Sequence, residues 1–372
     1  MIKILSLYHE NFNYGGMLQA YALSTFLINE GYNATQISYK RNYKRPSLIQ
    51  RIVRLTPSKL TSRILGAFCF AKRKCVRREK FVLFQNGFIP HTDKLYDSSN
   101  ISRVVESGDI FIVGSDQVWN PDWTEDVFYL DFAPNNKKIS YAASFGVSQV
   151  SSTYANHIRN LLKAFDSISV RELTAKQILN DIIDKSVQVV LDPTMLLTYE
   201  DWDQIATNDL KIDYPYAFVY LLGDQVELRL KAKKIAKEFG LKILFIPHVH
   251  LYYNINDVDY GDICLSNVGP NEFIEIVKKA SLVITDSFHG CVFSILFKKE
   301  FWVLNRQKEG ESGNTQSRIT SLIQILGLPE REVSAIKGNL KAQEKINYDM
   351  VSIKLEELRS KSSEWLQKAI NS

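Results

Sequence analysis

His289 belongs to the segment whose residue types are best suited to binding and catalysis, TDSFHG at residues 285–290. The segment lies where a short apolar strand pattern gives way to a helical one, and backbone N–H groups at a helix start favour an anion. Gly290 permits close approach of a ligand, Ser287 adds a hydroxyl, and His289 can donate a hydrogen bond or a proton. The alternative is ordinary helix capping, in which Asp286 or Ser287 is the N-cap and His289 only packs.

A second polar segment, residues 114–120, follows another apolar strand pattern. Ser115 suits an anion or a sugar, while Asp116 and Asn120 can bind sugar hydroxyls. Trp119 can stack on the face of a sugar ring. Equally, Asp116 can cap a turn while Trp119 fills the hydrophobic core. The composition of this segment permits a ligand-binding loop and a structural turn alike.

Two further positions supply donors at strand ends. Gly15 and Gly16 precede a helix whose Gln19 points toward the same end of the predicted sheet. A glycine pair there permits close ligand approach, although the G-x-G-x-x-G spacing of dinucleotide sites is absent. Arg171 directly follows the strand pattern 167–170. A lone arginine at a strand end is usually solvated or salt-bridged, yet a site for phosphate and carboxylate together requires such a fork.

These segments share one position, the end of a predicted strand. Short apolar runs alternate with polar loops and helical patterns, which predicts parallel sheets covered by helices and therefore an α/β fold. We expect two doubly wound, Rossmann-like domains, at 1–197 and 198–348, that face a cleft, followed by an amphipathic helix at 349–372. Ligands of such domains bind at the carboxyl ends of the strands, so we expect Ser144, which follows the run 138–143, to line the cleft as well. The predicted strands are 2–8, 109–113, 138–143, 167–170 and 188–191 in the first domain, and 216–222, 242–247, 282–285 and 300–304 in the second.

The composition excludes several other classes of protein. With 45% hydrophobic residues the 372-residue chain can bury a sizeable core, so it is neither disordered nor fibrous. No run approaches the roughly 18 apolar residues of a membrane-spanning helix, and the apolar start is too brief for a signal peptide. The four cysteines have no Cys-x-x-Cys spacing, which argues against a disulfide framework or a zinc site. We expect a cytoplasmic protein with free thiols and no metal.

The net charge of +5 is unevenly distributed. Residues 41–80 contain thirteen Lys and Arg and one acid, a charge of +12, so the other 332 residues carry −7. Apolar residues interleave with the basic ones, a pattern typical of a segment on an anionic membrane surface. Ordinary helices with a solvated basic face explain the pattern equally well. Nucleic acid is the least favoured partner, because no recognised binding motif accompanies the charge.

Taken together and in this order, the strand-end segments resemble the polysaccharide pyruvyl transferase family. The resemblance runs from about residue 10 to residue 328 and leaves 41–80 without a motif of its own. The stretches that carry it are Asn13-Tyr14-Gly15-Gly16 with Gln19-Ala20, Gly114 to Asn120, Ser140 to Gly146, Ser169 to Glu172, Leu191-Asp192-Pro193-Thr194, Asp286 to Gly290, and Arg318-Ile319.

The resemblance implies a glycosyltransferase-B-like fold and transfer of the enolpyruvyl group of phosphoenolpyruvate to a sugar. The usual product is a cyclic pyruvate ketal on a bacterial surface glycan or its lipid-linked precursor. His289 would be the acid that protonates C3 of the donor, because this step generates an oxocarbenium-like centre at C2. Phosphoenolpyruvate would be a co-substrate, with no other cofactor. The donor would contact Arg171, Ser287, Gly290 and Arg318, and the acceptor or cleft would involve Gly15, Gly16, Gln19, Ser115, Asp116, Trp119, Asn120 and Ser144.

One position departs from the family pattern. Some members have an arginine two residues before the histidine, where this chain has Ser287, and Arg306, Lys308 or Arg318 could substitute for it. Two rival functions stay open: a glycosyltransferase of the same fold that uses a nucleotide sugar, and a non-catalytic glycan-binding relative. For the pyruvyl transferase, the expected partners are phosphoenolpyruvate, an undecaprenyl-diphosphate-linked sugar and, through 41–80, the inner face of the cell membrane.

Overall fold

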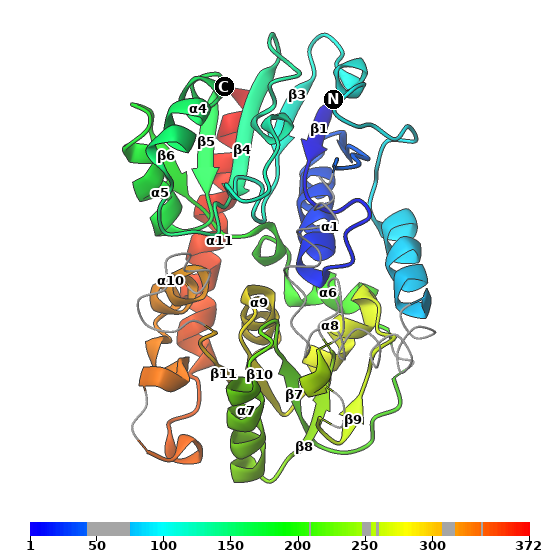
Figure 1. The fold of residues 1–372 in the computed structure, drawn as a ribbon, viewed down its shortest axis with the longest axis vertical. Helices are drawn as coiled ribbons and strands as arrows, with labels where there is room; N and C mark the ends of the chain where they lie inside the picture. The colour runs from blue at the N-terminus through cyan, green and yellow to red at the C-terminus, as the bar shows by residue number, and fades with distance from the viewer. Residues whose placement is uncertain (43–74, 208–209, 248–253, 258–259, 307–316, 336–337) are drawn as a thin grey trace, which may run out of the picture.

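The computed structural model describes residues 1–42, 75–207, 210–247, 254–257, 260–306, 317–335 and 338–372. In these ranges the chain forms two parallel β-sheets, and Figure 1 shows the first sheet above the second with one long helix running beside both. We call each sheet with its covering helices the N-terminal and the C-terminal domain. This architecture confirms the predicted α/β fold class with two Rossmann-like domains.

The N-terminal sheet has six strands within the described ranges, all parallel, in the order β2-β1-β3-β4-β5-β6. Its central strands are short apolar runs buried on both faces, which is why they lack the alternation of a half-exposed strand. The strand order reverses between β1 and β3, so the loops after these two strands meet at a topological switch point. The strands are β1 (Ile2–Leu5), β2 (Ala34–Gln36), β3 (Ile110–Val113), β4 (Lys137–Ala143), β5 (Ser167–Val170) and β6 (Val187–Val189).

The C-terminal sheet is also parallel, and its described strands follow the order β11-β10-β7-β8-β9. Here the order reverses between β7 and β10, so the loop after β10, which carries His289, lies at a second switch point. The strands are β7 (Tyr216–Tyr220), β8 (Lys242–Phe245), β9 (Ile263–Cys264), β10 (Leu282–Thr285) and β11 (Phe301–Val303).

Helices connect and cover the strands. No helix in the described ranges is both long and apolar enough to cross a lipid bilayer. Of the basic segment 41–80, residues 43–74 lie outside the described ranges, and residues 75–88 form a helix. The other helices are α1 (Tyr14–Asn29), α4 (Ser152–Lys163), α5 (Leu173–Asn180), α6 (Tyr199–Ile205), α7 (Val226–Phe239), α8 (Pro270–Lys279), α9 (Phe288–Leu296), α10 (Ser317–Leu326) and α11 (Tyr348–Asn371).

Helix α11 bridges the two domains, as Figure 1 shows. Near its start, the Tyr348 hydroxyl donates a hydrogen bond to the carbonyl of Ser294 in α9 (3.3 Å). Near its end, Lys137 Nζ at the start of β4 donates to the carbonyl of Ile370 (3.0 Å). Most of its apolar residues are buried along one face, including Val351, Leu355 and Leu366, while Met350 and Ile353 are exposed. This burial confirms the predicted C-terminal amphipathic helix.

Candidate active site

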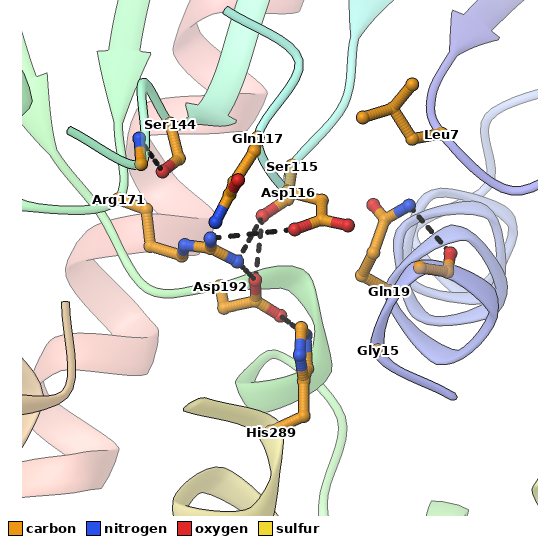
Figure 2. A network of polar contacts seen from close by, with 12 residues as sticks. Leu7, Gly15, Gln19, Ser115, Asp116, Gln117, Ser144, Arg171, Asp192 and His289 are labelled. Atoms are coloured by element: carbon orange, nitrogen blue, oxygen red, sulfur yellow. Dashed lines mark hydrogen bonds and ion pairs between the residues drawn. The ribbon is translucent and has the colours of Figure 1, made fainter. Parts of the chain in front are cut away.

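The carboxyl ends of strands from both domains meet at Asp192, just beyond the end of β6 (Figure 2). Its Oδ2 accepts hydrogen bonds from Ser115 Oγ (2.7 Å) and Arg171 Nη1 (2.8 Å). Its Oδ1 accepts from the hydroxyl (2.6 Å) and the backbone N–H (3.0 Å) of Thr194. The same Oδ1 lies 3.8 Å from Nε2 of His289, which the C-terminal domain supplies. A single buried carboxylate therefore connects the two domains.

Arg171 is enclosed, and its guanidinium is only partly used by the protein. Besides Asp192, it lies 3.7 Å from a carboxylate oxygen of Glu172 and 3.8 Å from one of Asp116, and it stacks 4.4 Å above the ring of Phe288. Within the described ranges, Nε and Nη2 are buried without a hydrogen-bond acceptor. A planar fork with two such N–H groups is suited to a carboxylate or a phosphate.

His289 lies in the first turn of α9, against the other domain. Ser287 is the N-cap of α9, and its hydroxyl accepts from the N–H of Gly290 (3.4 Å). A Cβ added to Gly15, at the start of α1, would lie 2.1 Å from His289 Nδ1. A Cβ on Gly290 would lie 2.4 Å from the hydroxyl oxygen of Thr285. The two glycines thus permit the close packing that brings the imidazole to Asp192.

Burial and neighbouring opposite charges act in opposite directions on the pKa values of Asp192 and His289, and the stronger effect differs between the two groups. Burial alone would raise the pKa of Asp192, but protonated His289, Arg171 and the hydrogen bonds just described outweigh it and lower this pKa to about 2. Burial lowers the pKa of His289 below its ordinary 6.5, because it outweighs the attraction of Asp192. Arg171 and Arg318 lower it further, whereas Asp116 raises it. The site therefore holds an ionised carboxylate beside a neutral imidazole near pH 7.

A second cationic side chain reaches the site from the C-terminal domain. Arg318, in α10, places Nη1 and Nη2 at 3.0 and 2.7 Å from the amide oxygen of Gln117 when that amide is oriented to accept. Gln117 in turn occupies the space beside Gly146, where a Cβ would lie 2.5 Å from it. Burial and then the neighbouring charge of Arg171 lower the pKa of Arg318 to about 10, so it stays protonated near pH 7. Arg171 and Arg318 thus bring two cationic side chains to a pocket that also holds the carboxylates of Asp116, Glu172 and Asp192.

Asp286 and Arg306 build the neighbouring wall of the C-terminal domain. Asp286 accepts hydrogen bonds from the backbone N–H groups of Leu222 (2.7 Å) and Gly223 (2.9 Å), in the loop after β7. Arg306 Nε lies 3.6 Å from the Asp286 carboxylate. Asp286 therefore fixes a loop and does not cap α9. Of the other basic residues considered as substitutes for the missing family arginine, Lys308 lies outside the described ranges.

In the loop after β3, some side chains face the candidate site and others are buried in the hydrophobic core. Ser115 and Asp116 face Arg171 and Asp192, whereas Trp119 is fully buried, stacks on Tyr129 (5.4 Å between centroids, 4° between planes) and donates from Nε1 to a backbone carbonyl. Trp119 offers no face to a sugar in this structure, because its ring fills the core. Asn120 is buried as well, and its side-chain oxygen accepts from the N–H of Asp122 (3.0 Å).

The remaining positions lie at the rim of the same site. Gln19 is fully buried; its amide donates to the carbonyl of Gly16 (2.9 Å), and within the described ranges its oxygen has no donor. A Cβ on Gly16 would lie 2.7 Å from the Leu7 carbonyl. Ser144 donates to Glu172 (2.7 Å), the carboxylate beside Arg171. Ser144 therefore positions a neighbour of the cationic group.

Analysis of the sequence missed the roles of Asp192, Thr194, Glu172 and Gln117. All four lie in stretches that carry the family resemblance, so a signal existed. Within the described ranges, no group of three or more His, Cys, Asp or Glu side chains is arranged to hold a metal ion.

Solved structures with this fold are distant in sequence. A protein assigned as UDP-N-acetylglucosamine 2-epimerase from Listeria monocytogenes aligns with a TM-score of 0.55 at 13% identity, over 97% of this chain and 90% of that chain. The N-terminal domain of trehalose-6-phosphate phosphatase from Candida albicans aligns with a TM-score of 0.52 at 10% identity, over 100% and 98%. UDP-GlcNAc 2-epimerase from Neisseria meningitidis, bound to UDP-GlcNAc, aligns with a TM-score of 0.50 at 13% identity, over 96% and 99%. At these identities the similarity establishes a glycosyltransferase-B-like fold alone.

No curated protein matches the sequence significantly. The family model described as polysaccharide pyruvyl transferase matches residues 13–308, which is well over half of the chain. The matched region contains Arg171, Asp192 and His289. On this match, the chain belongs to the polysaccharide pyruvyl transferase family.

Proposed function

We propose that this protein transfers the enolpyruvyl group of phosphoenolpyruvate to a sugar of a bacterial surface polysaccharide or its precursor. The observation that carries the proposal is the buried guanidinium of Arg171, whose Nε and Nη2 have no hydrogen-bond acceptor within the described ranges. Its Nη1 lies 2.8 Å from the Asp192 carboxylate, which faces His289. Phosphoenolpyruvate carries a carboxylate and a phosphate, so its site needs cationic donors for both. Arg171 and Arg318 supply these charges from opposite domains.

His289 protonates C3 of the donor in this proposal, which leaves an oxocarbenium-like centre at C2. A sugar hydroxyl then bonds to C2, the bond from C2 to the phosphate oxygen breaks, and a second hydroxyl closes the ketal. Of the two hydroxyl protons, one replaces the proton given to C3 and the other leaves with phosphate. Of the two aspartates beside Arg171, Asp116 is the more open to the acceptor, because its side chain is 19% exposed whereas that of Asp192 is fully buried.

The direct test is the reaction itself. The protein is incubated with phosphoenolpyruvate and candidate lipid-linked sugars, and mass spectrometry detects the gain of a pyruvate ketal and the release of phosphate. We expect His289→Ala to lower the rate by about 100- to 10,000-fold, the usual contribution of a positioned acid. Arg171→Ala should raise the KM for phosphoenolpyruvate.

A thermal-shift assay with nucleotides and a glycan-binding assay distinguish the rival functions. Thermal stabilisation by nucleotides and not by phosphoenolpyruvate would indicate a glycosyltransferase that uses a nucleotide sugar. A non-catalytic glycan-binding protein would form no product, and its glycan binding would be unchanged in His289→Ala.

We further propose that the acceptor is carried on undecaprenyl diphosphate and that the basic segment 41–80 holds the protein at the inner membrane face. The charge of +12 supports this. So does the helix 75–88, which begins inside the segment and continues past it. Just after the segment, Val82, Leu83 and Phe88 are 45%, 69% and 40% exposed. Exposed apolar side chains beside basic ones favour an anionic lipid surface.

A further inference from the structure

We propose that Asp192 is the counter-ion of His289, a positioning residue that makes the imidazole a proton donor only when the C-terminal domain brings it against the N-terminal one. The inference rests on the proposed function, because it concerns the acid of that reaction. It adds a role for a residue to which the sequence motifs assign none.

Asp192 is held in place by residues of its own domain, without a hydrogen bond from His289. Its four hydrogen-bond donors, from Ser115, Arg171 and Thr194, all belong to the N-terminal domain. His289 belongs to the C-terminal domain and lies 3.8 Å away, beyond the usual hydrogen-bond distance of 2.7–3.2 Å. Catalytic contacts are often long in the free enzyme and tighten in the complex. The geometry is that of a carboxylate whose Oδ2 pairs with Arg171 and whose Oδ1 faces the imidazole, where it can attract an imidazolium.

A purely structural role in holding Arg171 does not account for this placement. Arg171 already has the carboxylates of Glu172 and Asp116 within 4.0 Å. His289, by contrast, has one carboxylate within 4.0 Å among the described residues, and that is Asp192. Its Nε2 is enclosed there without a hydrogen-bond partner in the described ranges.

Apart from Asp116, the other charged surroundings of His289 oppose a positive charge on the ring. The ring lies against Gly15 in the first turn of α1, a 16-residue helix whose N-terminal end carries partial positive charge. Arg171 and Arg318 are cations, and Asp116 is the second acid that favours protonation. Phosphoenolpyruvate, as an anion beside Arg171, would offset these cations. Asp192 would then hold the imidazolium against the N-terminal domain.

The test follows the protonation of His289 itself, by NMR of the full chain labelled with 13C in its histidine rings. The His289→Gln variant identifies the His289 signal, and the other five histidines are internal references. Titrations are run on the free protein, with phosphoenolpyruvate, and with inorganic phosphate as a simpler anion. We expect Asp192→Asn to move the titration midpoint of His289 to lower pH by about one to three units. Phosphoenolpyruvate should raise that midpoint more in the wild type than in Asp192→Asn.

Glu172→Gln is the matched control, because it removes a carboxylate that lies beside Arg171 without pairing with His289. We expect its midpoint to stay near that of the wild type. Asp192→Glu retains the charge and should titrate between the wild type and Asp192→Asn. An unchanged midpoint in Asp192→Asn, or an equal shift in Glu172→Gln, overturns the proposal. If Asp192→Asn does not fold, a wild-type midpoint in Asp192→Glu together with a shifted one in Glu172→Gln overturns it.

The titration needs no turnover, so it is independent of the proposed function. If the protein transfers no pyruvyl group but the His289 midpoint depends on Asp192, the counter-ion proposal stands and the proposed function fails. If the protein is active but the His289 midpoint does not depend on Asp192, the proposed function stands and the counter-ion proposal fails. In the active protein, the alkaline limb of the kcat profile should also move to lower pH in Asp192→Asn and not in Glu172→Gln.

Discussion

Gly15 leaves the space that the imidazole of His289 occupies. Its Cα packs directly against the imidazole, so that even a methyl group would lie 2.1 Å from Nδ1. The glycine was expected to admit a ligand, but in this structure the space it leaves is taken by the histidine of the other domain. The residue therefore controls the approach of one half of the site to the other.

Gly15→Ala should consequently separate activity from stability. The added methyl group must displace the His289 ring, and a displacement of about 1 Å can lower kcat about 100-fold. Displacing the buried ring should cost about 1–3 kcal/mol of folding free energy, and the helix preference of alanine should offset about 1 kcal/mol of it, so the net change in stability should be small. Steady-state kinetics and urea unfolding measure the two effects.

Gly87→Ala is the control for this substitution. Gly87 lies in the helix 75–88, and a Cβ there meets no atom within 4 Å. This variant should keep its activity. Full activity in Gly15→Ala would contradict the assigned position of His289.

At the residue scale, the sequence predicted which loops matter better than what each residue does. Polar residues after apolar strands led to Arg171, Asp116 and His289, because parallel strands bring their carboxyl ends to one edge. Asp192 was missed, since an aspartate before a proline also fits a simple turn. Its importance depends on His289, which only the arrangement of two domains brings near.

At the scale of elements, α11 supports the loop that carries Asp192. The Ser362 hydroxyl, in the middle of α11, accepts a hydrogen bond from the backbone N–H of Leu191 (3.0 Å). Three residues earlier, Arg359 Nε donates to the carbonyl of Met195 (2.8 Å). The helix thus holds the backbone on both sides of the carboxylate.

Ser362→Ala should weaken both the fold and the site. It leaves the buried N–H of Leu191 without an acceptor, which typically costs about 1–3 kcal/mol. Because Leu191 precedes Asp192, kcat should fall as well. Ser360→Ala is the matched control on the same helix, where the exposed hydroxyl pairs with Glu364. That variant should change the free energy of unfolding by less than about 0.5 kcal/mol. Equal unfolding curves for the two variants would contradict the support assigned to α11.

The predicted strands and the observed ones agree where the apolar runs are long. The central strands of both sheets and the C-terminal helix were predicted, because their periodicity follows from burial on one or two faces. Two edge strands were missed, β2 with three residues and β9 with two. Runs of that length carry too little pattern to distinguish from loop. The domain boundaries at residues 197 and 348 stay predictions.

At the scale of the whole molecule, the site exists only where the domains touch. Tyr14, at the start of α1, donates to the carbonyl of Val268 (2.8 Å) and stacks on Phe273 in α8 (4.5 Å between centroids). Gln117 and Arg318 form a further contact across the domains. With Arg171 at 1% and His289 at 10% side-chain exposure, both groups are nearly closed off from solvent in this structure.

The net positive charge of the molecule is concentrated in residues 41–80, so its contribution to membrane binding can be tested by substitution. We expect replacement of the basic residues of 41–80 by Gln to abolish binding to vesicles that contain an anionic phospholipid, since each basic residue near such a surface contributes about 1 kcal/mol. Arg77, which is buried, and Lys80, which pairs with Glu272, are left unchanged. Activity on a detergent-soluble acceptor should persist. Vesicle sedimentation measures the binding.

The control replaces four exposed lysines of α7 by Gln, at Lys231, Lys233, Lys234 and Lys237. It removes positive charge from a distant surface and should leave vesicle binding intact. Undiminished binding after the changes in 41–80 would refute the membrane proposal.

The bond between Leu191 and Ser362 also has a consequence for biosynthesis. Ser362 follows Leu191 by 171 residues, so the ribosome makes the whole C-terminal sheet before the acceptor for this N–H exists. On the nascent chain, the first sheet can pair its strands, and Ser115, Arg171 and Thr194 can bind Asp192, while the N–H of Leu191 is still exposed to water. The backbone just before Asp192 therefore receives its last hydrogen-bond partner, Ser362, only after the strands of the C-terminal sheet have been made.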